Sequence, residues 1–124
     1  MPETSSTTAE LAGLPNLQSI YERLYERLPW PQPIPCPAEV TIRWKARVRG
    51  YLGRCTPKRK LIEINPIYQD PRLHPELEDL VAHEVAHFIW PNHSRNFTQF
   101  LRRVGVAGKY VHSRTTIQRK ATDL

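Results

Sequence analysis

The chain has 124 residues, of which 40% are hydrophobic, and it carries a formal net charge of +6. This length fits one domain with one modest core, and the apolar fraction excludes an intrinsically disordered chain. No apolar run approaches the about 20 residues of a membrane-spanning helix, and the polar start MPETSSTTAE lacks the basic and apolar regions of a secretory signal. We therefore expect a monomeric cytoplasmic protein with no membrane partner.

The first half of the chain predicts a tail, a helix and a connector. Residues 1–13 are polar and predict a flexible tail. Residues 15–28 predict an amphipathic helix, because apolar side chains recur there at helical spacing (Leu17, Ile20, Tyr21, Leu24, Leu28). Prolines at positions 29, 31, 33, 35 and 37 exclude helix and predict an extended connector.

Three short strands are expected next. Val40, Ile42 and Trp44 alternate with polar residues and predict a half-buried strand. A second strand is expected around residues 48–51, with turns at Gly50 and Gly53, and residues 61–65 (LIEIN) predict a third that ends at Pro66.

Two further helices follow the strands. Residues 75–89 predict a helix that Pro91 stops, since proline disfavours helix in the residue before it. Ser94 is expected to cap a helix that ends near Val104, with Gly105 at its C-cap. The domain is expected to span residues 14–112 and to be followed by a basic tail, 113–124.

The charge is unevenly distributed. Eight basic residues lie between positions 39 and 60, and seven follow position 94, whereas residues 66–89 contain five acidic residues and one arginine. Segments 43–60 and 95–120 could thus contact DNA or another acidic partner, or they could form a solvated basic surface. Cys36 and Cys55 are expected to be free, partly buried side chains, because their spacing matches no thiolate zinc site and a reducing compartment disfavours a disulfide.

The chemistry of the chain is concentrated in LEDLVAHEVAHFIWPNHSRNF. His83, Glu84 and His87 form an HExxH pattern, and on a helix its two imidazoles lie on one side about 6 Å apart along the axis. Two nitrogen ligands can then converge on one zinc ion. Glu84 falls within the apolar stripe of the helix, where an unpartnered carboxylate is costly, so its presence favours a catalytic role.

The third ligand follows by elimination. The only acidic residue after Glu84 is Asp123, close to the end of the chain, which argues against a glutamate ligand from a later helix. His93 lies six residues beyond His87, past a Trp-Pro-Asn turn that can fold the chain back. Three histidines leave a fourth position for water, as in catalytic zinc sites.

These residues resemble the SprT-like zinc metallopeptidases and the related YgjP-like group. The resemblance is carried by HEVAHFIWPNHSRNF and by the upstream segment GRCTPKRKLIEINP, and it covers roughly residues 17–105. It implies an α+β, minimal zincin-like domain, in which a short, mostly antiparallel sheet packs on the HExxH helix and on one or two further helices. It also implies one catalytic Zn²⁺ on His83, His87 and His93, with Glu84 as the catalytic residue.

The predicted function is zinc-dependent hydrolysis of peptide bonds in a protein or peptide substrate. Glu84 would take a proton from zinc-bound water and deliver it to the leaving amine. Residues 61–65 could bind an extended peptide by edge pairing. Candidate oxyanion donors are Tyr68, Arg103, Tyr110 and His112. For each of them, and for His74 at the helix start, the sequence favours an ordinary packing or surface role over this one.

Two other interpretations stay open. One is a basic, zinc-stabilised nucleic-acid-binding module with lost or incidental hydrolase activity. The other is a helical protein whose histidines match the metal-binding spacing by chance.

Overall fold

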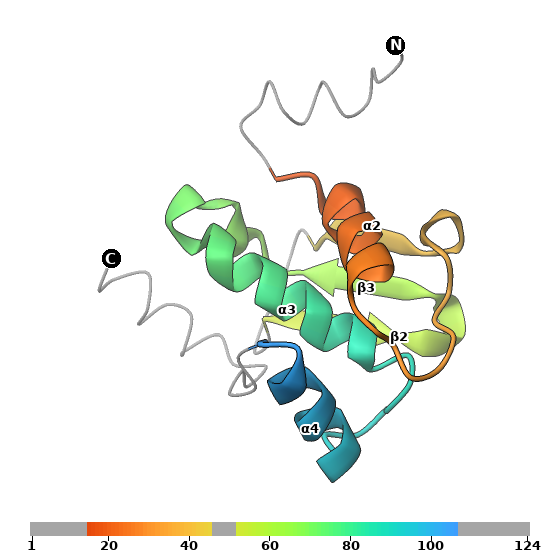
Figure 1. Cartoon of the computed structure of the whole chain (residues 1–124). Coiled ribbons are helices and arrows are strands. Elements are labelled where there is room, and N and C mark those ends of the chain that lie inside the picture. The colour runs from red at the N-terminus through yellow and green to blue at the C-terminus, as the bar shows by residue number, and fades with distance from the viewer. Residues whose placement is uncertain (1–14, 46–51, 107–124) are drawn as a thin grey trace.

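The fold is α+β, as expected, and the computed structural model describes residues 15–45 and 52–106. The main elements are helix α2 (Leu17–Arg27), strands β1 (Thr41–Trp44), β2 (Gly53–Thr56) and β3 (Leu61–Ile64), and helices α3 (His74–Ala86) and α4 (Arg95–Arg103) (Figure 1). Short 3-10 helices join them: η1 (Pro37–Glu39), η2 (Pro57–Arg59), η3 (Pro66–Gln69) and η4 (Pro71–Leu73). The tails expected at 1–13 and 113–124 lie outside the described residues.

The three strands form a mixed sheet in the order β1-β3-β2. β2 and β3 are antiparallel because they are joined by the tight turn η2, where Lys60 adopts a left-handed conformation with φ of 49°. β1 pairs with β3 in parallel, a pairing that the long connection through β2 permits. The sheet is therefore half parallel, where a mostly antiparallel one was expected.

The second strand of the sheet begins at a glycine that was expected in a turn. Gly53 begins β2, and the strand expected at 48–51 lies outside the described residues. The segment Gly53–Thr56 (GRCT) has too few apolar side chains to show the alternation that predicts a strand.

β3 is the central strand, and this contradicts the expectation that residues 61–65 bind a peptide by edge pairing. All four residues of Leu61–Ile64 are buried, and β1 and β2 occupy the two sides of the strand. Because both hydrogen-bonding edges of β3 are already paired, it has none to offer a substrate.

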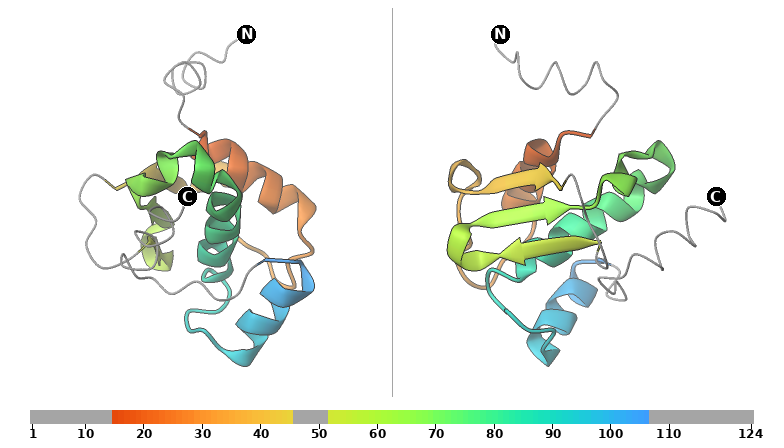
Figure 2. Two further views of the ribbon diagram at one scale, coloured as in Figure 1. Left: turned by 90° about the vertical axis from the view of Figure 1, so that its left-hand side faces the viewer. Right: turned by 180° about the vertical axis from the view of Figure 1, so that it is seen from behind.

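The helices pack on one face of the sheet. In the right-hand view of Figure 2 the opposite face of the sheet is toward the reader and the helices lie behind it. α3 lies across this face and contributes a fully buried apolar stripe of Leu77, Leu80, Val81 and Val85. The stripe meets Ile62 and Ile64 of β3 in a core that also contains Tyr21 of α2 and Tyr68 of η3. This packing holds the HExxH helix rigidly against the sheet.

α4 forms a second, smaller core with the end of α3. The Ser94 hydroxyl accepts a hydrogen bond from the Phe97 N–H, which confirms the predicted N-cap. At the other end Gly105 has φ of 82°, and N–H groups of Gly105 and Val106 donate to the carbonyls of Arg102 and Leu101, a Schellman ending. Aromatic contacts hold α4 in place, since the Phe100 ring centroid lies 4.9 Å from that of Trp30 and 5.5 Å from that of Trp90.

Within the described ranges, every helix is too short or too polar to cross a membrane. Cys36 and Cys55 are free and half-buried, as expected.

Candidate metal centre

Two of the predicted ligands lie on the last turns of α3. His83 is buried within the helix, with 1% of its surface exposed, and His87 is the C-cap residue, with 9% exposed. Their ring centroids are 5.1 Å apart, so the four-residue spacing does place both imidazoles on one side of the helix.

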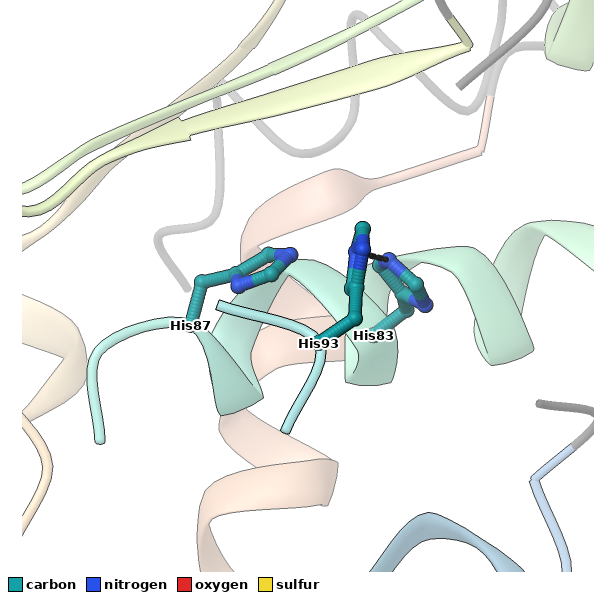
Figure 3. Close-up of side chains that lie close together, drawn as sticks. All are labelled: His83, His87 and His93. Carbon is teal, nitrogen blue, oxygen red and sulfur yellow. Dashed lines mark hydrogen bonds between the residues drawn. The ribbon is translucent and has the colours of Figure 1, made fainter. Parts of the chain in front are cut away.

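The third histidine arrives from the loop that follows α3. The helix ends before Pro91, and the chain turns back so that His93 faces α3 (Figure 3). The His93 ring centroid lies 5.1 Å from that of His83 and 4.9 Å from that of His87. One ligand atom from each of the three histidines lies within 4.8 Å of the others, and they could hold a metal ion together.

The distance between two of these nitrogens is compatible with a shared metal ion. Zn–N bonds of about 2.0–2.1 Å in a tetrahedral site place ligand nitrogens about 3.3 Å apart. The Nε2 atoms of His83 and His93 are 3.2 Å apart, within hydrogen-bonding distance of each other. Binding of a metal at this point would replace their shared proton.

The orientation of His87 is set by the turn itself. Its Nδ1 lies 2.9 Å from the Trp90 carbonyl oxygen. A carbonyl can only accept, so Nδ1–H is the donor and the Nε2 lone pair is left for a metal. The turn that returns the chain to His93 therefore also selects the tautomer of His87.

Phe97, the first buried residue of α4, packs against all three rings. Its ring centroid lies 4.7 Å from that of His87 in a stacked arrangement, and 4.9 and 5.1 Å from those of His83 and His93. Only 2% of Phe97 is exposed. A single aromatic side chain thus forms a common wall behind the three imidazoles. The sequence places Phe97 on the apolar side of a helix, but nothing in the sequence indicates this contact.

Glu84 lies beside the histidines and is completely buried, at 0% exposed. This confirms the expectation that it falls within the apolar stripe of α3. Glu84 is also one of the residues that line a cleft of about 390 Å³, together with His87 and His93. The carboxylate is therefore shielded from bulk solvent although Glu84 adjoins the cleft.

The cleft has two walls. One is β2 with the residue that follows it (Gly53, Arg54, Cys55, Pro57), and the other is formed by α3 and the His93 loop (Glu84, His87, Pro91, His93). Burial, with a smaller contribution from the charge of Glu84, raises the pKa of the Cys55 thiol to about 12. The Cys55 thiol is therefore neutral near pH 7. The contribution of β2 to the wall of the cleft was not predicted from the sequence.

None of the other candidate residues within the described ranges lines the cleft. Tyr68 is fully buried in the main core, Arg103 is exposed on α4, and neither lines the cleft. His74 is the first residue of α3, at the opposite end of that helix from His87. Tyr110 and His112 lie outside the described residues.

Comparisons with known proteins agree with this architecture. The crystal structure of the metallopeptidase zymogen abylysin from Pyrococcus abyssi is similar to the fold, with a TM-score of 0.60 and 19% sequence identity over 88% of this chain and 95% of that one. At this identity the likeness shows the fold alone. No curated protein sequence matches significantly. The sequence profile of the SprT-like family matches residues 17–119, and the chain therefore belongs to the SprT-like family.

Proposed function

We propose that the protein is a zinc-dependent metallopeptidase that hydrolyses peptide bonds of protein substrates. The observation that carries this proposal is a cluster of three imidazoles beside a cleft that is lined by two of them, His87 and His93, and by the buried carboxylate of Glu84. Three histidine ligands leave a coordination position open, which is typical of catalytic and not of structural zinc. Membership of the SprT-like family and the metallopeptidase fold support the same function.

The three histidines and Glu84 have different roles in the proposed reaction. His83, His87 and His93 would hold the ion, and zinc, when bound, supplies Lewis acidity toward the scissile carbonyl and lowers the pKa of a water molecule in its open position. The Glu84 carboxylate would take up a proton from the attacking water and would then donate it to the leaving amine. Because Glu84 is completely buried on α3, its carboxylate is restricted to a small region beside the cleft.

The substrate would occupy the cleft between β2 and the His93 loop. Of the residues that line the cleft, His93 is exposed, whereas Glu84 is completely buried. An unfolded protein segment, which has no fixed structure to clash with these walls, is the substrate that we expect to enter most readily.

Cleavage of an unfolded protein by wild type and by Glu84→Gln tests the proposal. We expect Glu84→Gln to lower kcat/KM by about 10²–10⁴-fold while it retains about one zinc per chain. A chelator should abolish wild-type cleavage, and added zinc should restore it. Equal cleavage by the two proteins, or cleavage that survives the chelator, would refute the proposal.

A basic nucleic-acid-binding function is the second candidate. It is favoured by the position of Lys58 and Arg59, which are exposed on η2 directly after the β2 wall, next to the exposed Arg54. DNA or another acidic partner could therefore lie beside the cleft. Binding of labelled DNA at increasing salt tests this: a Lys58→Ala/Arg59→Ala protein should bind more weakly and with a shallower salt dependence, whereas Glu84→Gln should bind as wild type does.

A further inference from the structure

The strand β2 passes unusually close to the carboxylate of Glu84. A Cβ atom built on Gly53 would lie 3.1 Å from Glu84 Oε2 and 3.3 Å from Glu84 Cγ. The next nearest atom would be Ile64 Cδ1, at 3.4 Å. Two of the three contacts would thus be closer than ordinary van der Waals distance, and both involve Glu84.

The backbone does not explain a glycine at this position. Gly53 lies in an extended strand in register with Ile64, a conformation that any residue adopts. Among the described glycines, a positive φ occurs at Gly105. What glycine provides at position 53 is therefore space for its neighbours.

Glu84 has little freedom to move out of the way. It is completely buried, on a helix whose neighbouring turns are packed in the core. A methyl group at position 53 would consequently displace its carboxylate by a few tenths of an ångström. None of the three nearest atoms belongs to a histidine, so the metal ligands would stay in place.

We propose that Gly53 is a positioning residue: the missing side chain on β2 leaves the pocket in which the Glu84 carboxylate is held over the metal centre. This inference rests on the proposed role of Glu84 as general base. This role explains why β2 begins with a glycine. The strand β2 then both lines the cleft and limits the position of the Glu84 carboxylate.

A double-mutant cycle tests the contact without reference to activity. Thermal unfolding of the metal-free protein is measured for wild type, Gly53→Ala, Glu84→Ala and the double variant. We expect Gly53→Ala to lower Tm when Glu84 is present, and to leave Tm unchanged or raise it in Glu84→Ala, where the added methyl group has room. Ile64→Val is the matched control, because it removes the third neighbouring atom and leaves Glu84 intact.

Kinetics tests the consequence. We expect Gly53→Ala to lower kcat by about tenfold, since small misplacements of a catalytic group are costly, with KM within twofold of wild type and the zinc content unchanged. Additive Tm shifts in the cycle would overturn the proposal, as would an unchanged kcat. If Gly53→Ala does not fold, recovery by Glu84→Ala supports the proposal, while recovery by Ile64→Val alone, or by neither change, overturns it.

The two proposals fail separately. A wild-type protein that binds zinc but cleaves no better than Glu84→Gln refutes the proposed function. In that case the double-mutant cycle of Tm values still shows whether a side chain at position 53 would clash with the Glu84 carboxylate.

Discussion

Replacement of Phe97 should weaken metal binding through the shape of the site, although Phe97 carries no ligand atom. The Phe97 ring contacts all three imidazoles, with centroid distances of 4.7, 4.9 and 5.1 Å. Without this wall each imidazole gains rotational freedom that must be lost again when a metal binds. Loss of outer-shell support around metal sites lowers affinity by about 10–100-fold.

The same residue also contributes to the core, and this effect must be separated from the first. Phe97 is 2% exposed, and removal of a buried phenylalanine side chain to alanine costs about 3–5 kcal/mol. That is a large fraction of the about 5–15 kcal/mol by which a domain is stable, so Phe97→Ala could unfold the metal-free protein. Phe97→Leu is the better change, because it keeps most of the apolar volume and removes the flat ring.

The assay compares Phe97→Leu with Phe100→Leu. Phe100 is a buried aromatic residue of the same helix, and its ring packs against Trp30 and Trp90. Competition with a chromogenic chelator gives the zinc affinity, and circular dichroism gives Tm of the metal-free proteins. We expect similar losses of Tm, with an affinity about tenfold lower for Phe97→Leu and within twofold of wild type for Phe100→Leu. Equal affinities in the two variants would refute the idea that Phe97 orders the ligands.

Three further predictions concern single side chains. Burial and the charge of Glu84 raise the pKa of the Cys55 thiol to about 12. Cys55 should therefore react with iodoacetamide at pH 8 on the order of a thousandfold more slowly than free cysteine does, because the thiolate is the reacting form. Mass spectrometry follows the reaction, and rapid labelling would contradict the burial of this thiol. Hydrogen bonds from Arg72 lower the pKa of Asp70 to about 2, so this carboxylate stabilises the fold above about pH 4 and loses its effect as the pH falls toward 2. In Asp70→Asn the free energy of unfolding, measured with urea, should therefore depend less on pH between 4 and 2 than in wild type. An unchanged dependence would exclude the Asp70–Arg72 pair as a source of acid sensitivity. Ser94→Ala should destabilise the protein by about 1 kcal/mol in urea unfolding through loss of the helix cap, and Ser94→Thr should restore most of this.

Much of the metal centre could be predicted because it is encoded in short-range patterns. The four-residue spacing of His83 and His87 places both on one helix side by geometry alone, and Pro91 ends that helix wherever the chain lies in the fold. The Ser94 cap and the left-handed Gly105 likewise depend on a few neighbouring residues. A helix and a turn were therefore sufficient to predict which three histidines meet.

The strand pairing could not be predicted in the same way. β1 is parallel to β3, and β3 is central, because of contacts between segments about 20 residues apart that no local pattern specifies. The expected peptide edge at 61–65 was wrong for this reason. β2 was missed at its true position because Gly53, Arg54, Cys55 and Thr56 contain little apolar alternation.

By itself, the sequence determined the three imidazoles, the buried carboxylate of Glu84 and the two caps of α4, since each follows from spacing within one or two turns of chain. Only the tertiary structure decided that Phe97 backs all three rings, that β2 walls the cleft and that Gly53 makes room for Glu84. Those features arise where distant segments are pressed together by the burial of the core, and packing at that scale depends on side chains from the whole domain at once.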